Sequence, residues 1–157
     1  MSKITKGIAE LCAEAEAAIE TWPVDKAMAH FEDEGVVFVD LRDVRELWRD
    51  GTIPGALHVP RGMLEFWVDP ESPYARNIFQ SGKRFVFFCS MGWRSALAAK
   101  AVRDMGLAPV CHIGGGFTAW REAAARSRRA NKSRRPNSRQ KVQAAALTPT
   151  RRSTRKF

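Results

Sequence analysis

The sequence predicts an α/β domain whose central, parallel-rich sheet is flanked by helices on both faces. Two short apolar runs, at 36–39 and 85–88, have the length and composition of strands covered on both faces, and residues 110–113 also predict a strand. Segments with helical periodicity lie between them, and glycines close several of these segments. Because strands that alternate with helices pair in parallel through crossover connections, one mainly parallel sheet is expected.

The first part of the chain predicts two helices. Residues 7–22 have the periodicity of an amphipathic helix. Its apolar face contains Ile8, Leu11, Cys12, Ala15, Ala18 and Ile19. Pro23 ends this helix and can occupy the first turn of a second helix at 24–33, which Gly35 stops. We therefore treat residues 1–22 as an N-terminal helical extension, which could mediate a homodimer.

The middle of the chain predicts short elements. Asp43 is placed to cap a helix that runs through Asp50 and ends at Gly51. Residues 56–59 could form a short strand, and the polar stretch 69–82 is expected to hold a short helix.

The second half predicts two strand and helix pairs. A strand at 84–89 leads through a glycine-containing turn to a helix at 95–105. A strand at 110–113 and a glycine turn at 114–116 lead to a final helix at 117–125. The main domain therefore spans residues 23–125.

Residues 126–157 form a basic tail. They contain twelve Lys or Arg residues and no acid, whereas residues 1–125 contain 14 basic and 17 acidic residues. With one aromatic residue, Phe157, the tail cannot offset its ordering entropy and is expected to be disordered. It could bind nucleic acid through phosphate contacts, although it lacks aromatic residues for base stacking, or it could be dispensable for activity.

Cysteine usage and hydropathy predict a cytoplasmic protein. No apolar run approaches the roughly 20 residues that span a bilayer, so no membrane association is expected. The acidic N-terminus does not have the pattern of a secretory signal. Cys12, Cys89 and Cys111 form neither a disulfide framework nor a metal-binding pair, and free thiols persist in a reducing compartment.

Cys89 is the candidate nucleophile because it ends an apolar strand and precedes a tight loop and a helix start. Ligands bind at the carboxyl ends of parallel strands. Loop amides and a helix N-terminus favour the thiolate, which is the reactive form. The candidate binding loop comprises Ser90, Met91, Gly92, Trp93, Arg94 and Ser95. The alternative is a cysteine that only fills space, the interpretation we give to Cys12 and Cys111.

Four segments, within roughly residues 23–125, resemble motifs of the rhodanese superfamily. Val39-Asp40-Leu41-Arg42, followed by Glu46, is similar to its first-strand motif. Gly51-Thr52-Ile53-Pro54-Gly55-Ala56-Leu57-His58-Val59-Pro60 is similar to its G-x-I-x-G-A-x-x-[IV]-P signature. Residues 89–95 resemble its active-site loop, and residues 114–120 match its closing G-G-x-x-x-W element. The order and spacing of the four motifs agree with the superfamily.

The resemblance implies sulfur transfer. The loop from Cys89 to Arg94 reads C-x4-R, whereas related dual-specificity phosphatases and arsenate reductases use a loop one residue longer. Cys89 would take sulfur from thiosulfate or a persulfide donor and pass it to a thiol, cyanide or protein acceptor, with no metal or organic cofactor. Arg94 would bind the donor's sulfonate or, alternatively, bridge the loop to a carboxylate.

Other residues have less specific expectations. Arg42, Arg61 and Trp67 could form the pocket rim, although a structural role is favoured for Arg42 and Asp40. His58 is expected to be a hydrogen-bonded core histidine. The alternative to an enzyme is a sulfur-carrier or protein-interaction module without turnover.

Overall fold

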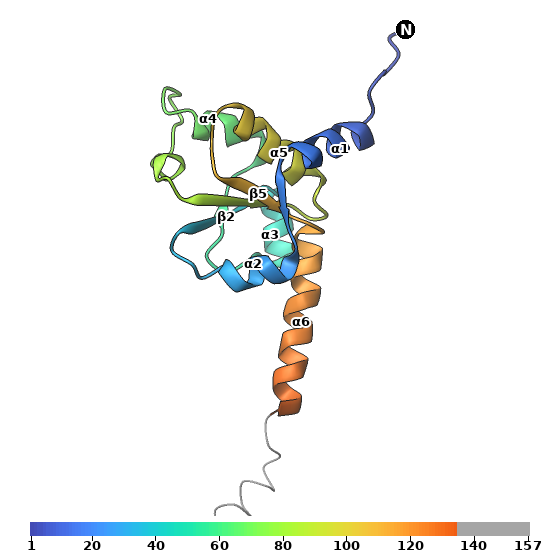
Figure 1. Ribbon diagram of the computed structural model, residues 1–157, viewed down its shortest axis with the longest axis vertical. Coiled ribbons are helices and arrows are strands. Elements are labelled where there is room, and N and C mark those ends of the chain that lie inside the picture. The colour runs from blue at the N-terminus through green and yellow to red at the C-terminus, as the bar shows by residue number, and fades with distance from the viewer. Residues whose placement is uncertain (135–157) are drawn as a thin grey trace, which may run out of the picture. The chain divides into compact units, whose positions relative to one another are not determined.

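Five parallel strands form one sheet in the computed structural model, which describes residues 1–134 (Figure 1). The strands, in sheet order, are β1 (Glu20–Trp22), β5 (Val110–Ile113), β4 (Arg84–Phe88), β2 (Val36–Asp40) and β3 (Leu57–His58). All of them lie in the compact unit formed by residues 1–123. The predicted α/β class with a parallel sheet is confirmed.

Alternate residues of the central strands point to opposite faces of the sheet. Phe85 and Phe87 of β4 join one buried cluster, and Val86 and Phe88 join the other. The first cluster includes residues of α4 (Leu64–Val68) and α5 (Trp93–Asp104). The second includes Ala27 of α2 (Val24–His30) and residues from the beginning of α6 (Gly116–Arg134). The continuous apolar runs therefore arise because β4 is covered on both faces.

The N-terminal segment differs from its prediction. Helix α1 (Ile8–Ala18) ends early, and the residues expected to complete it form β1, which pairs with β5. Pro23 disfavours helical backbone at Trp22, which is consistent with this change. β-branched and aromatic residues, here Thr21 and Trp22, also favour strands. The prediction of a helix through Trp22 is therefore wrong.

Helix α3 (Val44–Asp50) begins and ends as its sequence signals predict. The Asp43 side chain accepts a hydrogen bond from the Arg45 N–H, and Glu46 accepts one from the Asp43 N–H. Gly51 then ends the helix with a φ of 78°. The short helix expected at 69–82 is the 3₁₀ helix η2 (Asn77–Gln80).

The sequence did not predict the 3₁₀ helix η1 (Arg61–Met63) or the helix α4 that follows it. Helix α6 also extends to Arg134, so the disorder predicted from Arg126 is wrong for 126–134. Alanine and arginine, which recur here, have high helix propensity and permit this continuation. Residues 135–157, the rest of the predicted tail, lie outside the described residues. Within residues 1–134, no helix combines the length and apolarity needed to cross a bilayer.

Candidate active site

The loop that carries Cys89 connects the carboxyl end of β4 to the first turn of α5. Gly92 precedes the helix with a φ of 110°, which only glycine adopts readily. Helix α5 consequently begins at Trp93, before the predicted start at Ser95. The turn brings the Gly92 backbone N–H to 3.2 Å from the Cys89 Sγ atom.

The first turn of α6 holds the same loop from the other side. The backbone N–H groups of Phe117 and Thr118 donate to the carbonyl oxygens of Cys89 and Ser90, at 2.8 and 3.1 Å. A Cβ atom on Gly116 would lie 2.5 Å from the Cys89 carbonyl oxygen. Glycine at position 116 is thus a steric requirement of the loop, which gives part of the G-G-x-x-x-W pattern a physical reason.

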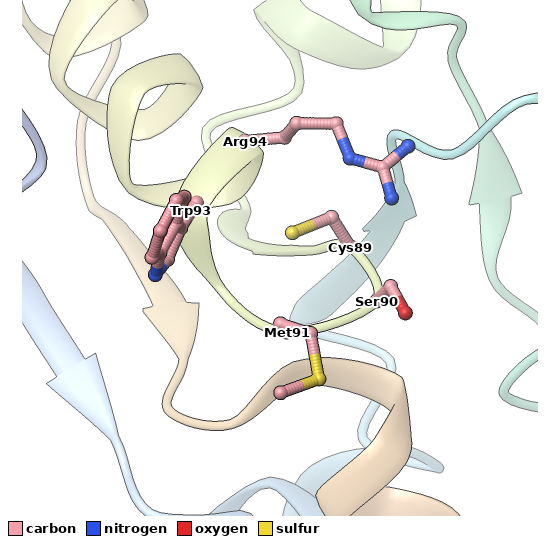
Figure 2. A pocket seen from close by; sticks show the side chains of 5 residues that line it. All are labelled: Cys89, Ser90, Met91, Trp93 and Arg94. Atoms are coloured by element: carbon pink, nitrogen blue, oxygen red, sulfur yellow. The ribbon is translucent and has the colours of Figure 1, made fainter. Parts of the chain in front are cut away.

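A cavity of about 370 Å³ opens beside the loop (Figure 2). It is lined by Cys89, Ser90, Met91, Trp93 and Arg94. Met91 and Trp93 are 64% and 58% exposed, whereas Cys89 is 1% exposed. The pocket therefore has an exposed apolar mouth and a nearly buried sulfur.

The Cys89 sulfur also faces a buried hydroxyl group. The Ser95 Oγ atom lies 3.6 Å from the sulfur and 3.2 Å from the Gly92 carbonyl oxygen. It is also 2.9 Å from Nδ1 of His112, whose Nε2 is 3.0 Å from Oγ1 of Thr21. Because Ser95 is fully buried, its hydrogen bonds are formed within the protein.

Arg94 is paired with Glu46 from the first turn of α3. Its two terminal nitrogens donate to the two carboxylate oxygens at 2.8 and 2.9 Å. Hydrogen bonding from Arg94 is the largest influence on Glu46 and lowers the pKa of this carboxyl to about 2. The geometry thus matches the alternative expectation for Arg94, in which it bridges the loop to a carboxylate.

Arg42, expected at the pocket rim, is buried and does not line the pocket. Its guanidinium group donates to both oxygens of Asp40 at 3.0 and 2.8 Å, and to the Gly51 carbonyl oxygen at 2.7 Å. It also stacks over the Phe117 ring. Asp40 and Arg42 therefore tie β2 to the segment that follows α3, as the structural interpretation predicted.

Arg61 and Trp67 do not line the pocket at Cys89 either. Arg61 of η1 forms an ion pair with Glu65 of the following helix α4. Trp67 lines a separate cavity of about 220 Å³, together with His58. Nε2 of His58 is 2.7 Å from the Arg42 carbonyl oxygen, so the expected hydrogen bond is present, but the side chain is half-buried and not part of the core.

The sequence analysis missed His112 and Thr21, which interact across the paired strands β5 and β1. A histidine inside an otherwise apolar strand was the available signal for the first. Cys111 has a pKa raised to about 12 because it is buried, and burial raises the pKa of Cys12 as well, in agreement with structural roles. Across residues 1–134, no three His, Cys, Asp or Glu side chains are grouped to hold a metal ion.

Comparison with known proteins identifies the family to which the chain belongs. The model of the rhodanese-like domain matches residues 23–123. Human thiosulfate:glutathione sulfurtransferase is 32% identical over 84 residues, which are 50% of this chain and 73% of that protein.

Two solved structures extend the comparison. A protein of unknown function and possible tyrosine phosphatase from Rhodopseudomonas palustris CGA009 is 55% identical, with a TM-score of 0.76 over 79% of this chain and 96% of that one. A rhodanese-related protein from Thermoplasma volcanium shares the fold at 21% identity and a TM-score of 0.54, over 66% of this chain and 92% of that one. On the family match, the chain belongs to the rhodanese-like family, and it is homologous to a human sulfurtransferase.

Proposed function

We propose that this chain is a sulfurtransferase that carries sulfane sulfur as a persulfide on Cys89. The observation that supports this most directly is the nearly buried Cys89 sulfur, 3.2 Å from the Gly92 N–H and facing the Ser95 hydroxyl. Both groups can donate hydrogen bonds to a thiolate, and such charge-assisted bonds favour the nucleophilic form.

The reaction is a double displacement. The Cys89 thiolate attacks the outer sulfur of the donor, forming a sulfur–sulfur bond and releasing the remainder of the donor with its electron pair. With thiosulfate, the released group is sulfite. A thiolate or cyanide acceptor then attacks the terminal sulfur of the persulfide, and Cys89 leaves again as the thiolate. A negatively charged Cys89 sulfur therefore begins and ends each cycle.

The pocket favours an organic or protein persulfide over thiosulfate as the donor. Binding a sulfonate through Arg94 would compete with the two hydrogen bonds between Arg94 and Glu46. The exposed apolar side chains of Met91 and Trp93 instead suit the carbon skeleton of a thiol or a protein surface. The human relative's name includes thiosulfate, so thiosulfate is assayed as a donor beside a persulfide.

Phosphate ester hydrolysis is the competing activity, because the R. palustris relative is a possible tyrosine phosphatase. The C-x4-R loop is one residue shorter than the loop of related phosphatases. The positive charge of Arg94 is also already paired with the Glu46 carboxylate. A short loop fits a single sulfur atom better than a phosphate group. We therefore expect sulfur transfer and no significant hydrolysis of aryl phosphates.

A sulfur-carrier module that a partner protein loads is the second candidate. The exposed Met91 and Trp93 side chains at the pocket mouth are the features that favour it. Phe66 is also exposed, but it contacts Tyr74 and does not line this pocket. A carrier would form the persulfide yet turn over poorly with small donors.

Mass spectrometry of the intact protein tests the proposal. The wild type and Cys89→Ser are each treated with thiosulfate, glutathione persulfide or an aryl phosphate. A gain of one sulfur atom on the wild type alone, followed by its loss on adding a thiol, is expected. Steady-state turnover with the same donors then separates the enzyme from the carrier. An aryl phosphatase activity that Cys89→Ser abolishes, without any sulfur adduct, would contradict the proposal.

A further inference from the structure

Four side chains from four parts of the fold form a continuous series of polar contacts that ends at the reactive sulfur. Thr21 lies on β1, His112 on β5, Ser95 on α5 and Cys89 at the end of β4. The successive distances are 3.0, 2.9 and 3.6 Å. His112 is 1% exposed, so its two ring nitrogens depend on Thr21 and Ser95 for hydrogen bonds.

The possible hydrogen positions restrict how this series can work. Ser95 has one hydroxyl proton but three neighbours: the Gly92 carbonyl oxygen, His112 Nδ1 and the Cys89 sulfur. If Nδ1 of His112 is unprotonated, the Ser95 proton must point to it. If Nδ1 carries the proton, it donates to Ser95 Oγ, and the serine proton is free to turn to the sulfur.

Thr21 is compatible with the second arrangement. With Nδ1 protonated, the neutral imidazole has an acceptor at Nε2, and the Thr21 hydroxyl can donate to it at 3.0 Å. The pairing of β1 with β5 places Thr21 opposite His112 in the sheet. The strand that the sequence analysis missed therefore supplies the outer end of the series.

We propose that His112 and Thr21 are positioning residues that keep the Ser95 hydroxyl proton available to a negatively charged Cys89 sulfur. This deepens the proposed function, since the thiolate is both the attacking group and the leaving group of that reaction. Cys89 loses its proton to water, the Ser95 O–H turns from the Gly92 carbonyl oxygen to the sulfur, and His112 stays neutral while its Nδ1–H donates to Ser95.

The surroundings of His112 agree with a neutral ring. Burial lowers the pKa of His112, and Glu16 of α1 opposes this effect only in part. The other titratable groups that act on this cluster are Cys12 of α1 and Arg94 of α5, with Glu46 of α3 bound to Arg94. A histidine that stays neutral is suited to orient Ser95 rather than to store the proton of Cys89.

The test follows the pH dependence of Cys89 alkylation by iodoacetamide in the full chain, with peptide mass spectrometry to locate the label. Ser95→Ala should raise the pH midpoint of labelling and slow labelling at pH 7 about tenfold, because it removes the charge-assisted bond to the sulfur. His112→Leu should change both in the same direction, because Ser95 loses the Nδ1–H that leaves its own proton available to the sulfur. Thr21→Val should slow labelling of Cys89 about threefold. This effect is smaller than that of Ser95→Ala, because the Ser95 hydroxyl is still present to bond the sulfur. His112→Asn, which can place an amide N–H near the position of Nδ1, should restore most of the rate.

The double variant Ser95→Ala/His112→Leu distinguishes positioning from general support of the fold. If His112 acts through Ser95, the double variant labels no more slowly than Ser95→Ala alone. His58→Asn is the matched control, because His58 bonds a backbone oxygen away from the pocket, and it should label like the wild type. Thermal unfolding of each variant confirms that the labelling is measured on folded protein.

An unchanged midpoint in folded His112→Leu, or additive losses in the double variant, would overturn the proposal. If His112→Leu does not fold, Thr21→Val and His112→Asn, which are smaller changes, still test the proposal. Labelling depends on the thiol alone, so it can succeed where persulfide formation fails. The proposed function and this inference can thus fail separately.

Discussion

Replacing Glu46 with glutamine should destabilise the protein by removing the charge that Arg94 binds while keeping the shape of the side chain. Glutamine also serves at the third position of a capping box, so the start of α3 should be preserved. The carboxyl pKa of about 2, against an ordinary value of 4.5, corresponds to about 3 kcal/mol. The Arg94 side chain is 41% exposed, so solvent screening reduces the expected loss to about 1–2 kcal/mol.

The pH dependence gives this prediction its direction. The carboxyl pKa is lower in the folded than in the unfolded protein, so the stabilisation is complete above pH 4.5 and declines as the pH falls towards 2. Urea denaturation of the wild type and Glu46→Gln should show the full difference at pH 7. The difference should be roughly half as large at pH 3.

A matched control separates this pair from ordinary surface charges. Asp104→Asn removes one partner of the exposed pair with Lys100 and should change the unfolding free energy by less than about 0.5 kcal/mol. The melting temperature of Glu46→Gln should fall by about 3–8 °C. If Glu46→Gln equals the wild type at pH 7, or if the difference is the same at pH 3, the charge of Glu46 does not contribute to the stability of the protein.

Three further predictions concern the supports of the site. Gly116→Ala should lower the unfolding free energy by about 1–3 kcal/mol and slow Cys89 labelling, because its Cβ would meet the Cys89 carbonyl oxygen; a wild-type melting temperature would contradict this. Asp40→Asn should cost about 3–5 kcal/mol in urea denaturation because it leaves the buried Arg42 charge uncompensated, and a loss as small as that of Asp104→Asn would refute a buried-pair role. Cys111, with a pKa of about 12, should resist iodoacetamide at pH 8 until the chain is unfolded, and labelling of the native protein at this site would show that the burial is incomplete.

The sequence predicted the parts of the fold that local patterns determine. The two apolar runs and the predicted strand at 110–113 became β2, β4 and β5, and both faces of the sheet are covered. Asp43 and Gly51 marked the ends of α3, since capping and left-handed backbone are properties of individual residues. The position of Cys89 between a strand and a helix followed from the same local signals.

The rest depends on contacts between distant segments. The choice of Glu46 as the partner of Arg94 requires α3 and α5 to meet, which no local pattern states. Arg42 was a candidate for the pocket rim with a structural role favoured, but its actual burial depends on Asp40 and the Phe117 ring, which compensate its charge. The three residues of β1 are too few for a periodic signal, and their strand exists because β5 offers an edge.

That short strand also affects where the domain can be cut. The family match begins at residue 23, directly after Trp22, which is buried in the core. A truncated chain that starts there would retain all four sequence motifs but would leave the β5 edge unpaired, and exposed edges recruit other chains. Boundaries drawn from motifs alone would thus yield a protein with all the residues of the Cys89 loop and a tendency to aggregate.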